Sequence, residues 1–307
     1  MLNGILNVYK EKGYTSHDVV ARLRGITGQR KIGHTGTLDP EACGVLPVCL
    51  GNATKLCGML TEKQKEYIAW MKLGISTDTQ DLTGQLLETC PVAVTEEEIR
   101  KAAAAFVGEY DQIPPMYSAL KINGKRLYRL AREGKVVERK SRRVEIHELE
   151  VLKTRLPEVQ IRVLCSKGTY IRTLCADLGE RLGCKAAMAS LERMRSGQFT
   201  VSDARTLKEI EEQKKLGRLQ ELLIPTEHMF LHYPLLMLLP AGDKPALNGN
   251  KLPLEVLKEQ EREMVQTQGG CYRIHTNRTG FCGIYEYRHE ERLLVPVKLF
   301  FRQEKEK

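Results

Sequence analysis

Residues 31–51 read KIGHTGTLDPEACGVLPVCLG, and this stretch sets how the N-terminal part of the chain is interpreted. Glycines flank His34, and a single acid, Asp39, stands directly before a proline. Glycine permits backbone conformations that strain other residues, and an Asp-Pro pair is typical of a turn. The sequence therefore predicts a loop followed by a strand, and it leaves open why the loop carries one carboxylate.

The segments on both sides of this loop predict further strands and helices. Residues 4–28 predict a short strand, a turn and a helix with Ser16 as its N-cap. Residues 65–75 alternate like a half-buried strand that places Tyr67 and Met71 on one face. These elements predict a sheet with helices packed against it.

A well-signalled helix follows, with Thr95 as N-cap, Glu98 at the capping-box position and Gly108 as its end. The next predicted elements are strands over 142–154 and 158–170 and a helix over 171–183 that closes on Gly183. The order lacks the regular strand–helix alternation and the glycine fingerprint of a dinucleotide-binding fold. We therefore predict a mixed α+β fold.

The composition changes after about residue 225. Prolines and short strands separated by polar turns follow, as in a small β-barrel module. We place the domain boundary near Pro225, within about five residues. This divides the chain into a domain over 1–225 and a second one over 226–307.

Composition narrows the class of protein. The chain has 307 residues, 42% of them hydrophobic, and a formal net charge of +9. We see no signal peptide and no apolar stretch long enough to span a bilayer, so we expect a cytoplasmic protein. The nine cysteines contain no C-x-x-C spacing, which favours reduced thiols over a metal site.

The basic charge is concentrated in one segment. In residues 121–143, ten of 23 side chains are Lys or Arg and two are acidic. A run of charge is often only a solvated helix face. Here Tyr128 and two glycines interleave the cations, which favours a mobile arm laid along the phosphates of a nucleic acid.

Five motifs occur in a fixed order over about 170 residues. They are KIGHTGTLDPEACGVLPVCLGNATK (31–55), KEY (65–67), PPMYSALKINGKRLYRLAREG (114–134), CSKGTYIRTL (165–174) and LERMRSGQF (191–199). In these motifs the chain resembles the TruB family, whose members isomerise uridine 55 in the T arm of tRNA to pseudouridine. The resemblance covers roughly 1–225. It implies the pseudouridine synthase fold, a mixed and largely antiparallel sheet flanked by helices, with an RNA-binding arm at about 112–143 and a PUA-like C-terminal module.

The resemblance also implies a site. Asp39 would be the catalytic carboxylate, and Arg172 would keep it ionised and oriented. One acid suffices because the reaction cuts a C–N bond and rejoins the base through carbon, whereas hydrolysis of a glycosidic bond uses two carboxylates. Whether Asp39 attacks the base, attacks the ribose or removes a 2′ proton is left open by the residues.

The other implied roles concern the flipped base. Tyr67 would stack on it, and its hydroxyl is a candidate for moving the carbon-5 proton. Tyr170 would bond near Asp39, Leu191 would line the uracil pocket, and His34 would fill the space that the base leaves in the RNA. Without the family, Tyr67 and Leu191 would be interpreted as core residues.

The implied partner is the T-arm stem-loop of tRNA. Lys121, Arg126 and Arg129 are the cations expected to hold its phosphates. No cofactor, metal or obligatory protein partner is expected, since isomerisation adds and removes nothing, and a monomer is the default. Two alternatives remain: an RNA-binding factor that has lost the chemistry, and an RNA-guided synthase that works inside a ribonucleoprotein.

Overall fold

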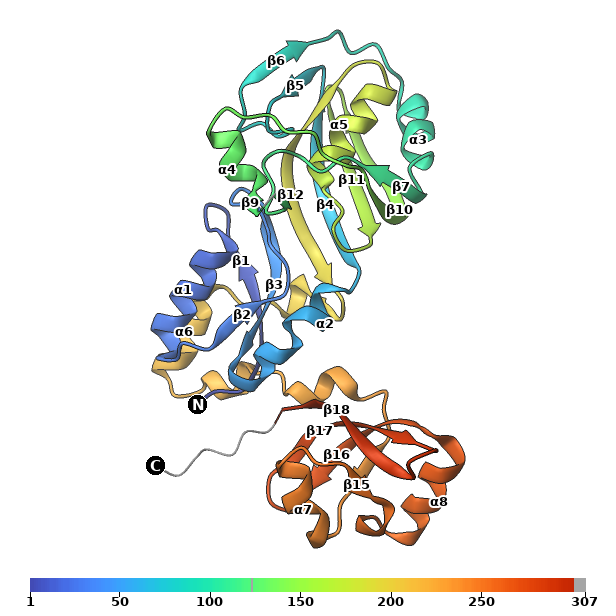
Figure 1. Ribbon diagram of the computed structural model, residues 1–307. Coiled ribbons are helices and arrows are strands. Elements are labelled where there is room, and N and C mark those ends of the chain that lie inside the picture. The colour runs from blue at the N-terminus through green and yellow to red at the C-terminus, as the bar shows by residue number, and fades with distance from the viewer. Residues whose placement is uncertain (123, 301–307) are drawn as a thin grey trace.

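A computed structural model describes residues 1–122 and 124–300. Figure 1 shows two parts, a larger one that contains the N-terminus and a smaller one made from the C-terminal strands and helices. No helix in those two ranges is long and apolar enough to cross a membrane. The nine cysteines are free thiols, and five of them are buried.

A nine-stranded sheet forms the larger part, in the order β1-β3-β12-β4-β11-β10-β7, with β2 on β3 and β13 on β12. Only the β3–β12 pair is parallel, so the expected mixed, largely antiparallel sheet is confirmed. Its strands are β1 (Gly4–Lys10), β2 (Ile32–His34), β3 (Cys43–Leu50), β4 (Lys65–Leu73), β7 (Gly108–Gln112), β10 (Arg142–Arg155), β11 (Glu158–Cys165), β12 (Ala186–Ser196) and β13 (Phe199–Thr200).

Two short ribbons and six α-helices complete this part. The ribbons pair β5 (Ile75–Thr77) with β6 (Leu86–Thr89) and β8 (Lys121–Ile122) with β9 (Lys125–Arg126). The helices are α1 (Ser16–Thr27), α2 (Cys57–Thr61), α3 (Glu96–Ala104), α4 (Leu127–Arg132), α5 (Ile171–Arg181) and α6 (Leu207–Lys215).

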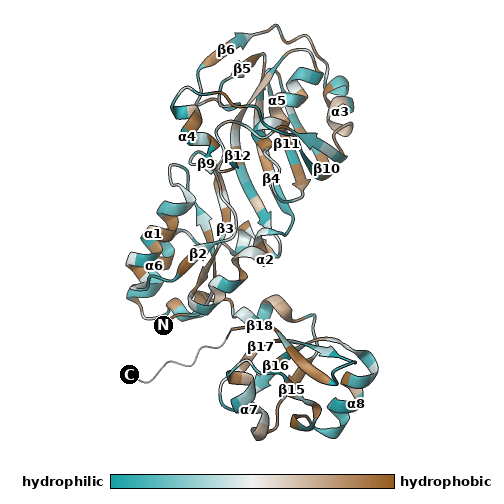
Figure 2. Cartoon of the chain, viewed as in Figure 1, coloured by the Kyte–Doolittle hydropathy of each residue, from teal (hydrophilic) through white to brown (hydrophobic). Residues whose placement is uncertain are grey.

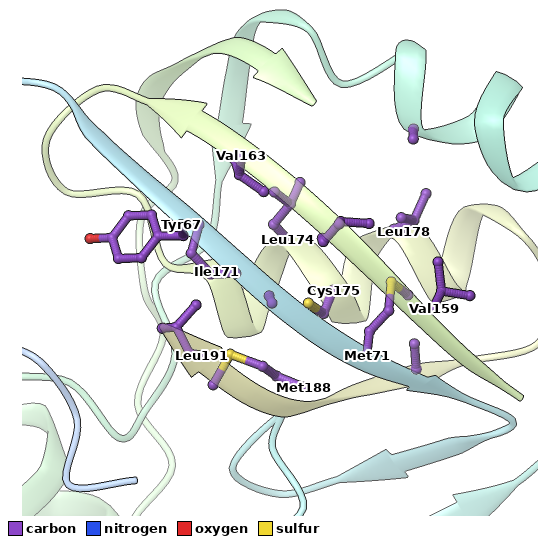
Figure 3. Close-up of a cluster of buried hydrophobic side chains, with 14 of the residues drawn as sticks. Tyr67, Met71, Val159, Val163, Ile171, Leu174, Cys175, Leu178, Met188 and Leu191 are labelled. Carbon is purple, nitrogen blue, oxygen red and sulfur yellow. The ribbon is translucent and has the colours of Figure 1, made fainter. Parts of the chain in front are cut away.

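The main core lies where α3 and α5 pack on the central strands (Figure 3). Every second residue of β4 is buried, as the alternation predicted, which places Tyr67 and Met71 on the core side. From α5, Leu174 and Leu178 meet this face with no exposed surface. The strand centre is therefore fixed by apolar packing, and the site residues at its end are held by a rigid scaffold.

A second core joins α1 and α6 to β1 and β3, and in Figure 2 both helices show a hydrophobic and a hydrophilic side. The predicted N-cap of α1 was wrong by one residue. Thr15 has the extended backbone of a cap and forms a capping box with Asp18. Ser16 instead turns inward and accepts a hydrogen bond from the backbone N–H of Leu38 at 2.9 Å.

The capping box at Thr95 and Glu98 is confirmed, but the predicted end of that helix was wrong. Helix α3 ends at Ala104, and Gly108 begins strand β7 with a φ of 104°. Gly108 lies four residues beyond the helix and serves the start of the next strand, because glycine adopts this positive φ without strain.

The smaller part contains a five-stranded sheet in the order β14-β16-β17-β18-β15 with its own apolar core. Its elements are β14 (Leu235–Met237), α7 (Pro240–Leu247), β15 (Leu252–Pro253), α8 (Glu259–Gln268), β16 (Gly270–Thr276), β17 (Gly280–Arg288) and β18 (Leu293–Leu299). The β-rich C-terminal module is confirmed. The two helices were not predicted. For α7 the prolines indicated breaks, whereas Pro240 starts this helix at a position where no backbone N–H is needed.

Apolar side chains from both parts meet in one cluster. Phe230, Ile284 and Phe300 pack with Ile5 and Val45 of the larger sheet, all of them almost completely buried. Asn52 also donates to the carbonyl of Phe300 at 2.7 Å. The residues just after 225 therefore belong to this shared cluster, and the boundary near Pro225 stays a prediction.

Deleting residues 226–307 should lower the Tm of the remaining chain. The deletion removes Phe230, Ile284 and Phe300 from the shared cluster, and burial of each such side chain stabilises by about 1.5–3 kcal/mol. Thermal unfolding of the truncated and full-length proteins tests this. A second truncation after Tyr233 keeps Phe230 and should be the more stable of the two. Equal Tm values for both truncations and the full chain would contradict the expectation.

Candidate active site

The loop between β2 and β3 carries Asp39 and is anchored on both sides. The Ser16 hydroxyl holds the backbone of Leu38, next to Asp39. Lys10, which has no exposed surface, donates from Nζ to the carbonyls of Pro40 at 3.1 Å and Ala42 at 2.5 Å. Burial lowers the pKa of Lys10 to about 8. A buried ammonium ion with carbonyl acceptors fixes the backbone around the acid.

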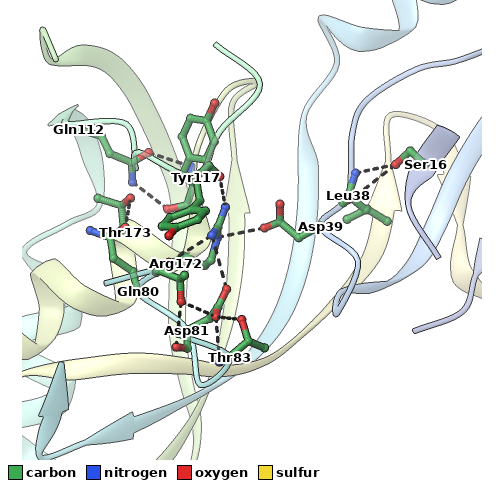
Figure 4. A network of polar contacts seen from close by, with 12 residues as sticks. Ser16, Leu38, Asp39, Gln80, Asp81, Thr83, Gln112, Tyr117, Arg172 and Thr173 are labelled. Carbon is green, nitrogen blue, oxygen red and sulfur yellow. Dashed lines mark hydrogen bonds and ion pairs between the residues drawn. The ribbon is translucent and has the colours of Figure 1, made fainter. Parts of the chain in front are cut away.

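Arg172 binds Asp39 from the opposite side of the site (Figure 4). Its Nε lies 3.0 Å from Oδ2 of Asp39, and only 6% of its side chain is exposed. The same guanidinium donates to the carbonyls of Thr79 at 3.1 Å and Tyr117 at 2.8 Å. The structure therefore brings together the two residues that sequence analysis paired, although they are far apart in the chain.

The environment of Asp39 acts on its charge in two directions. Burial raises the pKa of this carboxyl, the Arg172 guanidinium lowers it and the Asp81 carboxylate raises it. The side chain still keeps 39% of its surface exposed, so it can be reached from outside. A recessed acid beside a buried cation is the arrangement of a reactive carboxylate, because neighbours of this kind tune its ionisation.

Asp81 is a site residue that sequence analysis missed. Its Oδ2 lies 3.5 Å from Nη1 of Arg172, so two acids share one guanidinium. Its other oxygen accepts from the hydroxyls of Thr79 at 2.7 Å and Thr83 at 2.5 Å. The signal was the spacing Thr-x-Asp-x-Thr, which satisfies an acid locally and holds it in place.

Tyr67 and Leu191 lie on neighbouring strands, β4 and β12, at the end of the main core. In Figure 3 the ring of Tyr67 closes one end of the apolar cluster and its hydroxyl points away from that cluster. Both residues are 8% exposed. Burial raises the pKa of the Tyr67 hydroxyl. These two residues therefore offer an apolar and an aromatic surface at the edge of the core.

Tyr170 immediately precedes α5, in the same turn as Arg172. Its backbone forms two hydrogen bonds with the side chain of Gln112, from N to Oε1 at 2.7 Å and from Nε2 to the carbonyl at 2.9 Å. Burial raises the pKa of its hydroxyl, and the Asp39 carboxylate acts in the same direction. Gln112 is a further residue that sequence analysis missed, and it fixes where α5 begins.

His34 ends β2, five positions before Asp39 on the same loop. Its ring is half-buried and meets the ring of His17 edge-on, with 5.5 Å between the centroids. Burial lowers the pKa of His34, and the nearby His17 and Arg193 add to this. The environment of His34 therefore favours the neutral form of its ring over the charged form.

The basic segment forms a small folded unit with an apolar core of its own. Met116, Leu127 and Leu130 form its core. Lys121 pairs with Arg126 across the β8–β9 ribbon, and Arg129 follows in α4. The carbonyl of Tyr117 at the base of this unit is the one that Arg172 holds. The cations and the carboxylate site are thus connected through one arginine.

Two kinds of comparison place this arrangement among known proteins. A solved structure titled "Crystal Structure of a Cbf5-Nop10-Gar1 Complex" is 27% identical, covers 98% of this chain and 85% of that chain, and has a TM-score of 0.70. A second, an H/ACA RNP bound to a substrate RNA containing 2′-deoxyuridine, is 26% identical with a TM-score of 0.69 and covers 98% and 86%. The fold is that of the pseudouridine synthases.

Sequence relatives narrow the class to a family. Residues 24–171 match the TruB family pseudouridylate synthase (N terminal domain), and residues 172–231 match the tRNA pseudouridylate synthase B C-terminal domain. The tRNA pseudouridine synthase B of Lachnoclostridium phytofermentans is 48% identical over 97% of this chain and 100% of its own length. That of Alkaliphilus oremlandii is 42% identical over 99% and 100%. The chain belongs to the TruB family.

Proposed function

We propose that this protein converts uridine 55, in the T arm of tRNA, to pseudouridine and that Asp39 is the catalytic carboxylate. The observation that carries the proposal is the contact between Asp39 and the buried Arg172. Membership in a family of pseudouridylate synthases supplies the reaction, and the names of the relatives supply tRNA as the substrate.

The reaction needs one group that attacks or deprotonates the nucleoside and is regenerated at the end. The bond between uracil and ribose breaks, the base turns, and a carbon–carbon bond forms. An ionised carboxylate serves either as the nucleophile or as the base in such a sequence. Arg172 opposes the effect of burial on the pKa of Asp39. It also fixes the direction of the carboxylate, because a guanidinium holds several acceptors at once. Lys10 and Ser16 keep the loop from moving away.

The other residues receive the uridine after it leaves the RNA stack. Tyr67 supplies an aromatic face and Leu191 an apolar wall, both at the end of the main core. Tyr170 lies close enough to Asp39 for the carboxylate to act on its hydroxyl electrostatically. His34, neutral and half-buried on the same loop, stacks in the gap that the base leaves. Extracting a base is costly, and these contacts offset that cost.

The test is conversion of an unmodified tRNA transcript, and of a bare T-arm stem-loop, by the purified protein alone. Pseudouridine is mapped by position along each RNA. The proposal expects a single modified uridine, at position 55, in both substrates. Conversion at another position would overturn the choice of uridine. Tight binding without conversion would favour the RNA-binding alternative, and a requirement for a guide RNA would favour the ribonucleoprotein alternative.

Replacing Lys121, Arg126 and Arg129 together by Gln should weaken tRNA binding and make it less dependent on salt. Each lost phosphate contact lowers the slope of log K against log salt by about 0.9. Filter binding at several salt concentrations measures this slope. The matched control replaces Lys208, Lys214 and Lys215, exposed cations of α6, by Gln. Equal slopes for the two triple variants would exclude the basic segment as the phosphate contact.

A further inference from the structure

Arg193, on β12, is buried to a degree that is unusual for its charge. Only 1% of its surface is exposed, which makes it one of the largest fully buried side chains of the chain. Within the two ranges that the structure describes, it forms no ion pair with a carboxylate; carbonyl oxygens accept from it instead. Burying an arginine without a carboxylate is costly. The cost of burying Arg193 suggests that its guanidinium has a specific role.

The guanidinium joins three separate pieces of the site. Its Nε donates to the carbonyl of Val45 on β3 at 2.6 Å, and its Nη2 donates to the carbonyl of Gly36 at 3.3 Å. Gly36 lies on the loop between His34 and Asp39. On the other side, Arg193 is the direct cross-strand partner of Tyr67, and its side chain lies beside the Tyr67 hydroxyl.

The packing around Arg193 leaves little freedom. It is paired with Gly44 where β12 runs parallel to β3. A Cβ atom on Gly44 would lie 2.3 Å from the carbonyl oxygen of Arg193, so only glycine permits this approach. The position of Arg193 relative to β3 is therefore set by the backbone.

The chemistry of the guanidinium decides which group donates in the contact between Arg193 and the Tyr67 hydroxyl. Arginine has donors and no acceptor, so the Tyr67 oxygen can only accept from it. The phenolic proton must then point elsewhere, and in Figure 3 the hydroxyl of Tyr67 points away from the apolar core. A single side chain thus orients Tyr67 and holds the loop that carries Asp39.

We propose that Arg193 is a positioning residue that ties the Asp39 loop to Tyr67 and so sets the spacing between the carboxylate and the ring that receives the uridine. This inference rests on the proposed function. The surroundings support it, because Arg193 lies near the buried ammonium groups of Lys10 and Lys65. Burial lowers the pKa of each of these lysines to about 8, and repulsion from Arg193 adds to this. An apolar residue would avoid that repulsion.

The experiment compares wild type with Arg193→Met, Arg193→Lys, Tyr67→Phe and the double variant Arg193→Met with Tyr67→Phe. Three quantities are measured for each: the single-turnover rate of pseudouridine formation at saturating enzyme, the Kd for tRNA and the Tm. Arg195→Met is the matched control, because Arg195 lies on the same strand but pairs with Glu66 at 3.1 Å.

Both Arg193 variants should lower the single-turnover rate at least about tenfold, because misplacing reacting groups by an ångström can cost about a hundredfold. The Kd should change less than about threefold, since phosphate contacts dominate affinity. In the Tyr67→Phe background the loss caused by Arg193→Met should shrink, because residues that act as a unit are not additive. Arg193→Lys keeps the positive charge but not the planar guanidinium. A loss of rate in this variant therefore shows that the geometry of the guanidinium matters and not only its charge.

A rate within about twofold of wild type for Arg193→Met, or full additivity with Tyr67→Phe, would overturn the inference. The inference would also be overturned if the rate and the Tm fell together in both Arg193 variants, the variant with the larger loss of Tm also showing the larger loss of rate. That result is expected of a residue that only stabilises the fold. Failure of the wild type to form pseudouridine would instead contradict the proposed function. The two failures are thus distinguished within one experiment.

Discussion

Replacing Asp39 by asparagine is expected to reduce pseudouridine formation at least about a thousandfold while tRNA binding is retained. The amide has nearly the same shape as the carboxylate but cannot act as a nucleophile or accept a proton under these conditions. Arg172 keeps its contacts to Thr79 and Tyr117, so the site should stay assembled. Single-turnover assays with mapped products, together with Kd measurements, separate loss of chemistry from loss of binding.

The stability of this variant should fall little, because the Asp81 carboxylate still pairs with Arg172 when the Asp39 charge is removed. Burial raises the pKa of Asp39 in the folded protein, so the folded state favours the neutral form of this group more than the unfolded state does. Ionisation above that pKa therefore costs stability, and a neutral amide avoids the cost. Glu41→Gln is the control on the same loop, because Glu41 is exposed and pairs only with Lys12. A wild-type rate for Asp39→Asn would remove Asp39 from the catalytic role.

Local patterns were sufficient for the elements of the fold. Strand β4 follows from its alternation, because the period of two places every second side chain on the core face. Helix α3 follows from its capping box. Helix α8 was missed because its N-cap, Lys258, is not a typical capping residue. Helix α7 was missed because proline has opposite meanings at the start and in the middle of a helix. Which meaning applies depends on the packing around it, which a local pattern does not contain.

The site could be predicted only where a family motif named the residue. Asp39 and Arg172 come from distant segments, and no local rule pairs them. Asp81 and Lys10 were missed because each looks like an ordinary polar residue in a turn or at a strand end. Their importance lies in what they are buried against, Arg172 for the first and the carbonyl of Ala42 for the second. Contacts of this kind depend on the tertiary fold.

Replacing Arg172 by methionine is expected to have the second largest effect, on both stability and pH dependence. Removing one partner of a buried ion pair costs about 3–5 kcal/mol of unfolding free energy. We expect a value near 3 kcal/mol, because Asp39 is 39% exposed and solvent screens part of its charge. The variant also leaves the Thr79 and Tyr117 carbonyls without this donor. Urea unfolding measures the loss.

The pH profile of the single-turnover rate supplies a second readout for Arg172→Met. Arg172 lowers the pKa of Asp39, whereas burial and Asp81 raise it. Without the guanidinium the larger of the two lowering influences is lost, and only Lys10 still opposes burial and Asp81. The acid limb of the profile, which reports the pKa of the working carboxylate, should therefore move to higher pH. Arg172→Lys should leave this limb close to that of the wild type, because the positive charge is kept. It should still lower the rate, because an ammonium ion cannot replace the planar guanidinium that binds Asp39, Thr79 and Tyr117 together. Arg181→Met, on the exposed last turn of α5, is the matched control. An unshifted acid limb in Arg172→Met would mean that the ionisation governing the rate belongs to a group other than Asp39.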